Sequence, residues 1–309
     1  MARLTDVAAR NGVALRVIPV SRLAELREST AAFVRDTELS PATRQLLSLA
    51  SYDVPELPFT AQSLIIAATA SYSYCEVTFR RAGRDYPVYA ALIHPYETAA
   101  ADEFLAAEAA NSGFHYEKSD AWLPYKQLGV SSGLAVYGRN NITYTPEHGS
   151  FFVYSAYFSD VPPECDEWRD FAVAEQCASC GSCVRHCLTG ALDAERYMLD
   201  VSRCYSMLTM NAGEFPPFVP SAAHHTISRC LRCQMSCPMN RESAQNALPP
   251  VTFNENETEF VLSGASYDGA SEELRGKAKL FGLGMYPSVP RNLRVCFDLI
   301  DSGAVLTYA

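Results

Sequence analysis

The spacing of apolar residues predicts helices first and then a buried strand in the N-terminal part of the chain. Leu4, Val7 and Ala8 are spaced as on one face of a helix, and a second helical run covers about 21–36. The first 60 residues therefore look mostly helical. The run 63–68 is almost wholly apolar, which is typical of a strand buried on both faces.

Alternating patterns farther along predict a hairpin, a helix and another strand. Residues 75–93 give two strands joined near 82–85, and 99–112 gives a helix that ends at Gly113. Residues 149–159 are a clear strand. This mixture predicts the α+β class.

Two proline-containing stretches, 161–163 and 248–250, indicate boundaries in the chain. Between them the loops are short and apolar runs are few, so metal and not a large core is expected to organise this part. Beyond the second boundary the spacing predicts three helices, at about 256–263, 271–281 and 290–301. The predicted domains are 1–160, 161–247 and 248–309.

Composition narrows the class of protein. The net charge of −10 and pI of about 5.1 give no overall attraction to a phosphate backbone, so nucleic acid is expected to be an unlikely partner. No apolar run approaches the roughly 18–20 residues of a transmembrane helix. The N-terminus has polar residues where a signal peptide needs an apolar core, so a cytoplasmic protein is expected.

Cysteine spacing carries the strongest chemical signal. Eight of the eleven cysteines fall between 177 and 237, which is too uneven for a disulfide framework. The first group, 177–187, has the spacing C-x2-C-x2-C-x3-C, and the second, 230–238, reads C-x2-C-x3-C-P. Two zinc sites are the alternative, but zinc ribbons need only pairs of C-x2-C. The spacing favours two 4Fe–4S clusters, as in a two-cluster bacterial ferredoxin.

In such motifs the last cysteine of each run binds the other cluster. The predicted ligands of the first cluster are Cys177, Cys180, Cys183 and Cys237. The predicted ligands of the second cluster are Cys187, Cys204, Cys230 and Cys233. This assignment also accounts for Cys204, which lies alone between the two motifs.

The other thiols and a histidine pair have structural interpretations. Cys75 and Cys296 lie among apolar residues and are expected in the core. Cys165 lies in a polar loop. His224 and His225 are neighbours in sequence, and neighbouring side chains seldom bind one metal.

The order of motifs resembles the epoxyqueuosine reductase family, whose members are cobalamin-dependent iron–sulfur enzymes related to reductive dehalogenases. The resemblance rests on the run 132–141 (SGLAVYGRNN), the GSFF at 149–152, the cysteine frame with TGA at 189–191, and the CPMNR at 237–241. It covers about 118–242. The tail after residue 250 looks short for the helical repeats that hold tRNA in that family, which suggests a short branch.

The resemblance implies a fold, cofactors and site residues. It implies a nitroreductase-like α/β sandwich, a ferredoxin-like module, and a corrinoid (cobalamin) held between them and reduced through the clusters. The family's proton-donating aspartate aligns with Ser119, so the adjacent Asp120 is the candidate catalytic residue. The candidate cofactor-binding residues are Lys126, Tyr137, Arg139, Asn140 and Asn141. For Lys126 and Arg139, solvated or paired surface charge is the alternative.

Three functions remain open at this stage. The first is a corrinoid-linked iron–sulfur oxidoreductase that acts on a small or protein-bound substrate. The second is an electron-transfer protein that reduces a corrinoid protein or another redox partner. The third is an epoxyqueuosine reductase that acts on tRNA. Each requires a low-potential electron donor such as ferredoxin or flavodoxin.

Overall fold

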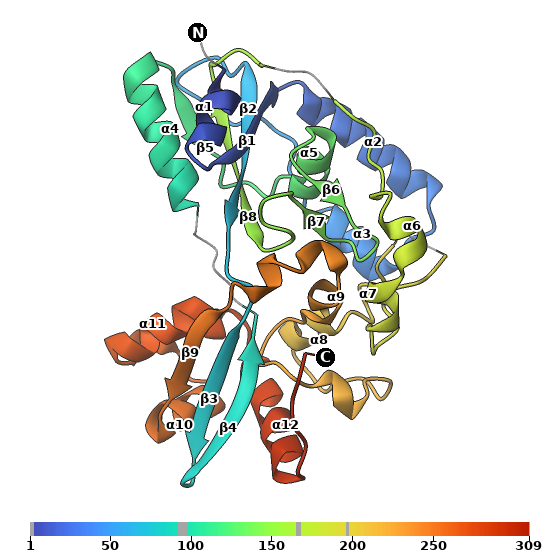
Figure 1. The fold of residues 1–309 in the computed structure, drawn as a ribbon, viewed down its shortest axis with the longest axis vertical. Coiled ribbons are helices and arrows are strands. Elements are labelled where there is room, and N and C mark those ends of the chain that lie inside the picture. Colours follow the sequence, from blue (N-terminus) through green and yellow to red (C-terminus); the bar gives the residue numbers. More distant parts are fainter. Residues whose placement is uncertain (1–2, 92–97, 165–167, 196–197, 309) are drawn as a thin grey trace. The chain divides into compact units, whose positions relative to one another are not determined.

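A computed structural model describes residues 3–91, 98–164, 168–195 and 198–308, and Cys165 lies outside them. The chain forms two compact units (Figure 1). Unit 1 comprises Met1–Ser71 and Tyr96–Ala178, and unit 2 comprises Tyr72–Pro95 and Ser179–Ala309. No helix in the described ranges has both the length and the apolar character needed to cross a bilayer.

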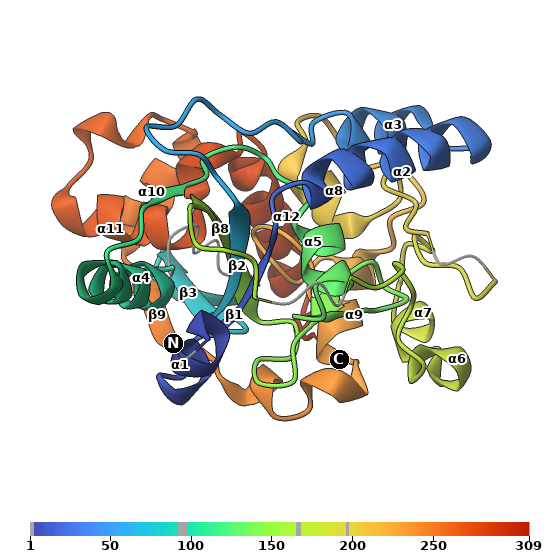
Figure 2. The same cartoon turned by 90° about the horizontal axis from the view of Figure 1, so that it is seen from above.

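Unit 1 is built on an antiparallel sheet with the strand order β1-β2-β8-β5. Helices cover both faces of this sheet (Figure 2). The strands are β1 (Ala14–Pro19), β2 (Ser63–Ala70), β5 (Tyr116–Lys118) and β8 (Phe152–Ser159). The helices are α1 (Leu4–Arg10), α2 (Arg22–Asp36), α3 (Pro41–Leu47), α4 (Ala99–Ser112) and α5 (Tyr125–Ser131).

Strand β2 explains why both faces of the sheet are covered. Its first six residues are buried, as the apolar run at 63–68 predicts. Ile65 and Ala67 point into a core shared with α1 and α4. Leu64 and Ile66 point into a second core shared with α2 and α5. Side chains alternate along a strand, so a continuous apolar run supplies both cores at once.

The N-terminal 60 residues are less helical than predicted, because β1 lies between the first two helices. Leu15 and Val17 are buried and alternate with the less buried Arg16. This six-residue strand is too short for its alternation to stand out beside two helical runs. The helix predicted at 99–112 is confirmed as α4, which ends at Gly113 in the left-handed conformation with φ of 73°.

Unit 2 contains a three-stranded sheet with the order β4-β3-β9. The predicted hairpin is confirmed as β3 (Cys75–Arg81) and β4 (Arg84–Ala90), and its turn residues Ala82 and Gly83 both have positive φ. Strand β9 (Leu248–Phe253) pairs in parallel with β3, beside a register shift. Its two prolines are tolerated because β9 lies at the edge of the sheet.

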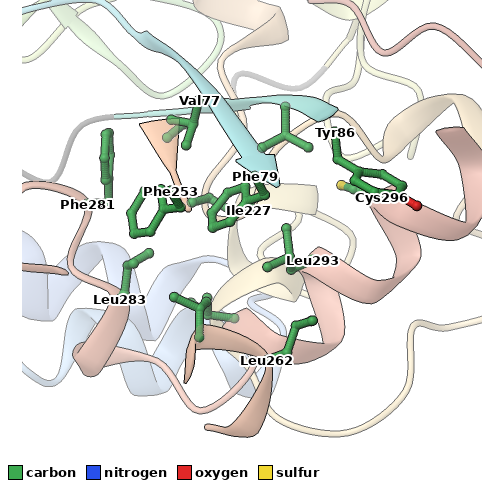
Figure 3. Close-up of a cluster of buried hydrophobic side chains, with 14 of the residues drawn as sticks. Val77, Phe79, Tyr86, Ile227, Phe253, Leu262, Phe281, Leu283, Leu293 and Cys296 are labelled. Carbon is green, nitrogen blue, oxygen red and sulfur yellow. The ribbon is translucent and has the colours of Figure 1, made fainter. Parts of the chain in front are cut away.

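Three helices pack against this sheet and close the core of unit 2 (Figure 3). The rings of Phe79 and Phe253 stack at 4.5 Å, and Phe297 lies 4.2 Å from Tyr86. Cys75 and Cys296 are fully buried in this core, as predicted. The helices are α10 (Glu255–Ser263), α11 (Glu272–Phe281) and α12 (Val289–Asp301), which confirms the three helices predicted for the tail.

Short elements make up the remainder of the two units. In unit 1, β6 (Val136–Tyr137) and β7 (Thr143–Tyr144) form a two-stranded ribbon. The short α-helices are α6 (Cys177–Cys180), α7 (Ser182–Arg185), α8 (Tyr205–Met210) and α9 (Arg232–Met235). The 3-10 helices are Ser221–Ala223, Pro238–Asn240, Ser243–Gln245, Tyr267–Gly269 and Leu283–Met285.

The compact units divide the chain differently from the predicted domains 1–160, 161–247 and 248–309. The β3–β4 hairpin lies between the two sequence segments of unit 1. It nevertheless belongs to unit 2, because it packs in one core with α10, α11 and α12. The cause is the parallel pairing of β3 with β9, because β9 brings the helices that follow it against the hairpin.

Replacing Gly129 with alanine should destabilise unit 1 by about 1–3 kcal/mol, because a Cβ there would lie 2.7 Å from Cζ of Tyr154. Gly276→Ala is the matched control, since Gly276 is also helical and has open space beside it. Alanine there should stabilise the protein by about 0.5–1 kcal/mol. Anaerobic urea unfolding measures both variants. Equal stabilisation by the two substitutions would contradict the predicted clash.

Candidate functional site

Short helical turns position the cysteines of the first motif. Helix α6 begins at Cys177 and ends at Cys180, and α7 contains Cys183. Gly181 separates the two helices in the left-handed conformation, with φ of 60°, which glycine adopts without strain. The chain therefore changes direction between the second and third thiols, as wrapping around a cluster requires.

The two cysteine motifs meet through equivalent turns in unit 2. Helix α7 of the first motif packs against α9 of the second, which contains Cys233. The hydroxyl of Ser182 donates a hydrogen bond to the carbonyl of Ser236 at 2.8 Å. Motifs far apart in sequence are thus joined side by side, as interleaved ligation needs.

Two of the predicted second-cluster residues, Cys187 and Cys204, lie within electrostatic range of Cys230. Burial raises the pKa of the Cys230 thiol to about 12, with smaller contributions from Cys204 and Cys187 in the same direction. Because charge interactions weaken with distance, both thiols lie near Cys230. The backbone N–H of Ala191 donates to Sγ of Cys187 at 3.3 Å, after a left-handed Gly190. Amide hydrogen bonds to sulfur are typical of cluster-binding loops.

The ligand sets themselves stay predictions. Within the described ranges, no three His, Cys, Asp or Glu side chains converge tightly enough to hold a single metal ion. The donors nevertheless suit iron–sulfur clusters, because eight thiols occupy the predicted spacing and all of them lie in the described part of the chain.

The glycine-containing motif forms a tight turn at 137–141 that joins β6 to β7. The N–H of Gly138 donates to the carbonyl of Ile142 at 2.7 Å, and Asn141 is left-handed with φ of 63°. A Cβ at Gly138 would lie 2.6 Å from the ring of Tyr144. The turn therefore requires glycine at this position and packs against the ring of Tyr144.

Four of the five candidate cofactor-binding residues contact one another or Tyr144 at this turn. Lys126 donates from Nζ to the carbonyl of Asn141 at 2.6 Å. The hydroxyl of Tyr137 donates to Oδ1 of Asn141, and the Asn140 amide donates to the hydroxyl of Tyr144 at 2.7 Å. Burial raises the pKa of Tyr137 to about 12, so its hydroxyl keeps its proton at neutral pH. These contacts fix the shape of the turn.

Arg139, the fifth candidate, connects the turn to the first cysteine motif. Its side chain is 7% exposed, which argues against the surface-charge alternative. Its backbone N–H donates to Sγ of Cys177 at 3.5 Å, and its guanidinium donates to the carbonyl of Cys177 at 3.1 Å. One residue therefore contacts a predicted cluster ligand through both its backbone and its side chain.

Asp120 lies near the same group of residues. It is exposed and follows β5, and its charge adds to burial in raising the pKa of Tyr125. Tyr125 precedes Lys126 and stacks on Tyr154 at 5.9 Å. The carboxylate of Asp120 is thus close to the first turn of α5, and its catalytic role stays a prediction. The hydroxyl of Ser119 accepts a hydrogen bond from the nearby N–H of Ala121 at 3.3 Å.

The sequence patterns did not single out three tyrosines near the candidate residues, because aromatic residues in a strand or helix look like ordinary core positions. Tyr144 accepts from Asn140, Tyr125 precedes Lys126, and Tyr154 stacks on Tyr125. The motif TYTPEHGSFFVY at 143–154 offered one signal, since it places two of these tyrosines soon after the turn.

His224 and His225 are buried side chains, as expected. Nδ1 of His224 lies 2.9 Å from the hydroxyl of Tyr205, and Nδ1 of His225 lies 2.7 Å from the carbonyl of Ala223. Burial lowers the pKa of each ring from 6.5 to about 4. Both rings are therefore neutral at pH 7.

These two rings predict that the protein loses stability in acid. Below pH 6.5 the unfolded chain binds protons that the folded protein does not accept until about pH 4, so the free energy of unfolding falls across this window. For His225 the loss is on the order of 1–3 kcal/mol. Anaerobic unfolding of the cluster-loaded protein at pH 7 and pH 5 measures it. His225→Phe should weaken this dependence, and a slope equal to that of the unsubstituted protein would contradict the assignment.

Comparison with known proteins places these features in context. Residues 176–240 match the family described as a 4Fe-4S double cluster binding domain. The epoxyqueuosine reductase of Vibrio cholerae is 25% identical over 273 residues, which is 83% of this chain and 70% of the relative. That of Escherichia coli is 34% identical over 119 residues, which is 38% of this chain and 30% of the relative. The chain therefore carries a double-cluster domain and resembles epoxyqueuosine reductases, as predicted.

A solved structure extends the likeness to the fold. An epoxyqueuosine reductase with an epoxyqueuosine-modified tRNA-Tyr stem loop has a TM-score of 0.62 and 19% identity, covering 95% of this chain and 80% of the other. This confirms a mixed α/β fold, and the family match at 176–240 confirms its 4Fe-4S domain. The relatives from Vibrio cholerae and Escherichia coli are named reductases, which confirms the prediction of an enzyme.

The prediction that nucleic acid is an unlikely partner is wrong. A protein of similar fold was solved with a tRNA stem loop. The prediction relied on the net charge of −10, which averages over the whole chain. Binding of a phosphate backbone depends on the local potential of one surface, so an acidic total does not exclude it.

Proposed function

We propose that this chain is an iron–sulfur reductase that acts on epoxyqueuosine in tRNA, using a corrinoid in unit 1. The observation that carries the proposal is the pair of contacts between Arg139 and Cys177, which join a predicted cluster ligand to the turn at 137–141. Similarity to a reductase over 83% of the chain supports the substrate class, in preference to the small or protein-bound substrate first expected.

The contacts of Arg139 suggest a route for electrons. If Cys177 binds the first cluster, its sulfur lies within a hydrogen bond of the Arg139 backbone, at the edge of the turn. The clusters supply single electrons when they are bound. Amide hydrogen bonds to a ligand sulfur favour the reduced cluster, and Arg139 holds that amide in place through its second contact at 3.1 Å.

The residues at the turn fit a corrinoid, whose rim carries amide side chains. Lys126 and Asn141 offer ammonium and amide groups, and the buried Asn140 supports the turn by donating to Tyr144. Lys126 and Asn141 would help to hold the corrinoid. When bound, the corrinoid supplies the low-valent metal centre for reduction. We also propose that the sheet and helices of unit 1 form the nitroreductase-like sandwich expected for that cofactor.

Asp120 would supply a proton in this reaction. Reduction of an epoxide to an alkene takes two electrons and two protons and releases water. An exposed carboxylate can exchange protons with solvent and then donate one to the departing oxygen. Ser119 serves this role poorly, because a hydroxyl is a much weaker acid than a carboxyl group.

The test is anaerobic reconstitution with iron, sulfide and cobalamin, followed by an assay on tRNA that carries epoxyqueuosine. We expect about eight irons per chain, a bound corrinoid, and queuosine in the product. Eight irons with no corrinoid binding and no turnover would favour the electron-transfer alternative. A bound corrinoid with turnover of a small molecule and not of tRNA would reject the substrate.

A further inference from the structure

Arg232 is a buried cation inside the second cysteine motif. It lies between Cys230 and Cys233 in sequence, yet it is 8% exposed. Burial of a charged group is costly unless its hydrogen bonds are satisfied. The guanidinium donates to three carbonyls, at 2.8 Å to Ala222, 2.9 Å to Thr307 and 3.2 Å to Tyr308. These hydrogen bonds therefore hold a positive charge at this buried position.

That charge lies beside predicted cluster ligands. The backbone N–H of Arg232 donates a hydrogen bond to Sγ of Cys230. Arg232 is also the first residue of α9, which contains Cys233. The cation is therefore held between two residues that would bind the second cluster.

The segment 304–308 keeps the guanidinium in place. Leu306 packs against the core of unit 2, while Val305 is 85% exposed. The ring of Tyr308 lies 4.4 Å from Tyr89 and 5.0 Å from His225. Alternate side chains anchor this extended segment, and its carbonyls at 307 and 308 face Arg232.

At the position equivalent to Arg232, the first motif has Ser179, whose side chain is neutral. Its arginine contacts come from other positions, since Arg139 donates to the carbonyl of Cys177 at 3.1 Å and Arg185 to that of Cys180 at 2.9 Å. A cluster gains one negative charge when it is reduced, so a fixed positive charge beside it stabilises the reduced state and raises its potential. Arg232 is therefore expected to act on the second cluster.

We propose that Arg232, held by the segment 304–308, raises the reduction potential of the second cluster above the value it would otherwise have. The inference rests on the double-cluster domain and not on the substrate. It holds for an epoxyqueuosine reductase and for an electron carrier alike. A failed tRNA assay would leave it unaffected.

Redox titration of the anaerobically reconstituted protein, followed by electron paramagnetic resonance, tests the proposal. In Arg232→Met and Arg232→Gln one of the two midpoints should shift to a more negative potential while the other stays. The glutamine variant retains an amide that can donate to the carbonyl of Thr307. The control is Arg81→Met, which makes the same change in net charge at a half-exposed ion pair with Glu259 and should move neither midpoint.

Iron counting makes the result decisive. Neutral variants that contain about eight irons and have both midpoints unchanged would overturn the proposal. Loss of one cluster in both neutral variants, with both clusters kept in Arg81→Met, would also overturn it. That outcome would show that Arg232 is needed for assembly and not for tuning.

Discussion

Replacing Cys204 with alanine is expected to halve the iron content, from about eight to about four irons per chain, and to abolish reductase turnover. Cys204 lies outside both cysteine motifs, and its only predicted role is to complete the second cluster. Its electrostatic effect on Cys230 supports a position beside that cluster. Iron and sulfide analysis of the anaerobically purified variant, with electron paramagnetic resonance of the remaining cluster, measures the change.

Cys296→Ala is the control for this experiment. Cys296 is fully buried in the core of unit 2 and contacts the carbonyl of Thr226, so its loss should lower stability but retain both clusters. Full iron content in Cys204→Ala would contradict the ligand assignment. Zinc in place of iron in the wild-type protein would contradict the clusters themselves.

Asp120→Asn should lower kcat by roughly 10²–10⁴-fold with both clusters and the KM for tRNA retained. The substitution removes the proton but preserves the size of the side chain, so binding should change little. Single-turnover assays with chemically reduced protein isolate this step from electron delivery. Asp120→Glu should recover part of the rate, because it restores a carboxyl group.

Ser119→Ala tests whether Ser119, and not the neighbouring Asp120, is the proton donor. It removes a hydroxyl that accepts a hydrogen bond from Ala121, and it should leave kcat within a few-fold of wild type. If Ser119→Ala is inactive and Asp120→Asn is active, the proton donor is misassigned. If both are active, the proton comes from another group or from water.

The cysteine frame and the tail were the most predictable parts of the protein. Fixed spacing dictates the chemistry of the motifs, and local signals dictate the helices. Asn254 and Glu257 form a capping box at the start of α10, and Gly264 ends it in the left-handed conformation. These signals act over three or four residues and are visible in any short window of sequence.

Long-range pairings were not predictable in the same way. Leu248 to Phe253 contains two prolines and looked like a boundary, yet it is strand β9. Only its position at the sheet edge makes the prolines acceptable, and that position depends on β3, about 170 residues earlier. The contacts of Arg139 with Cys177 likewise join residues 38 positions apart. The pattern of residues along one sequence does not show which residues far apart in the chain come into contact.

The parallel pairing of β3 with β9 has a consequence during synthesis on the ribosome. The β3–β4 hairpin emerges early, but the strand that covers its other edge is made only after all of the cysteine motifs. Until then β3 exposes unpaired backbone groups and a face rich in apolar side chains. The nascent chain must keep this edge from pairing elsewhere while it completes the two cysteine motifs. The sheet of unit 2 can therefore close only after both motifs have been synthesised.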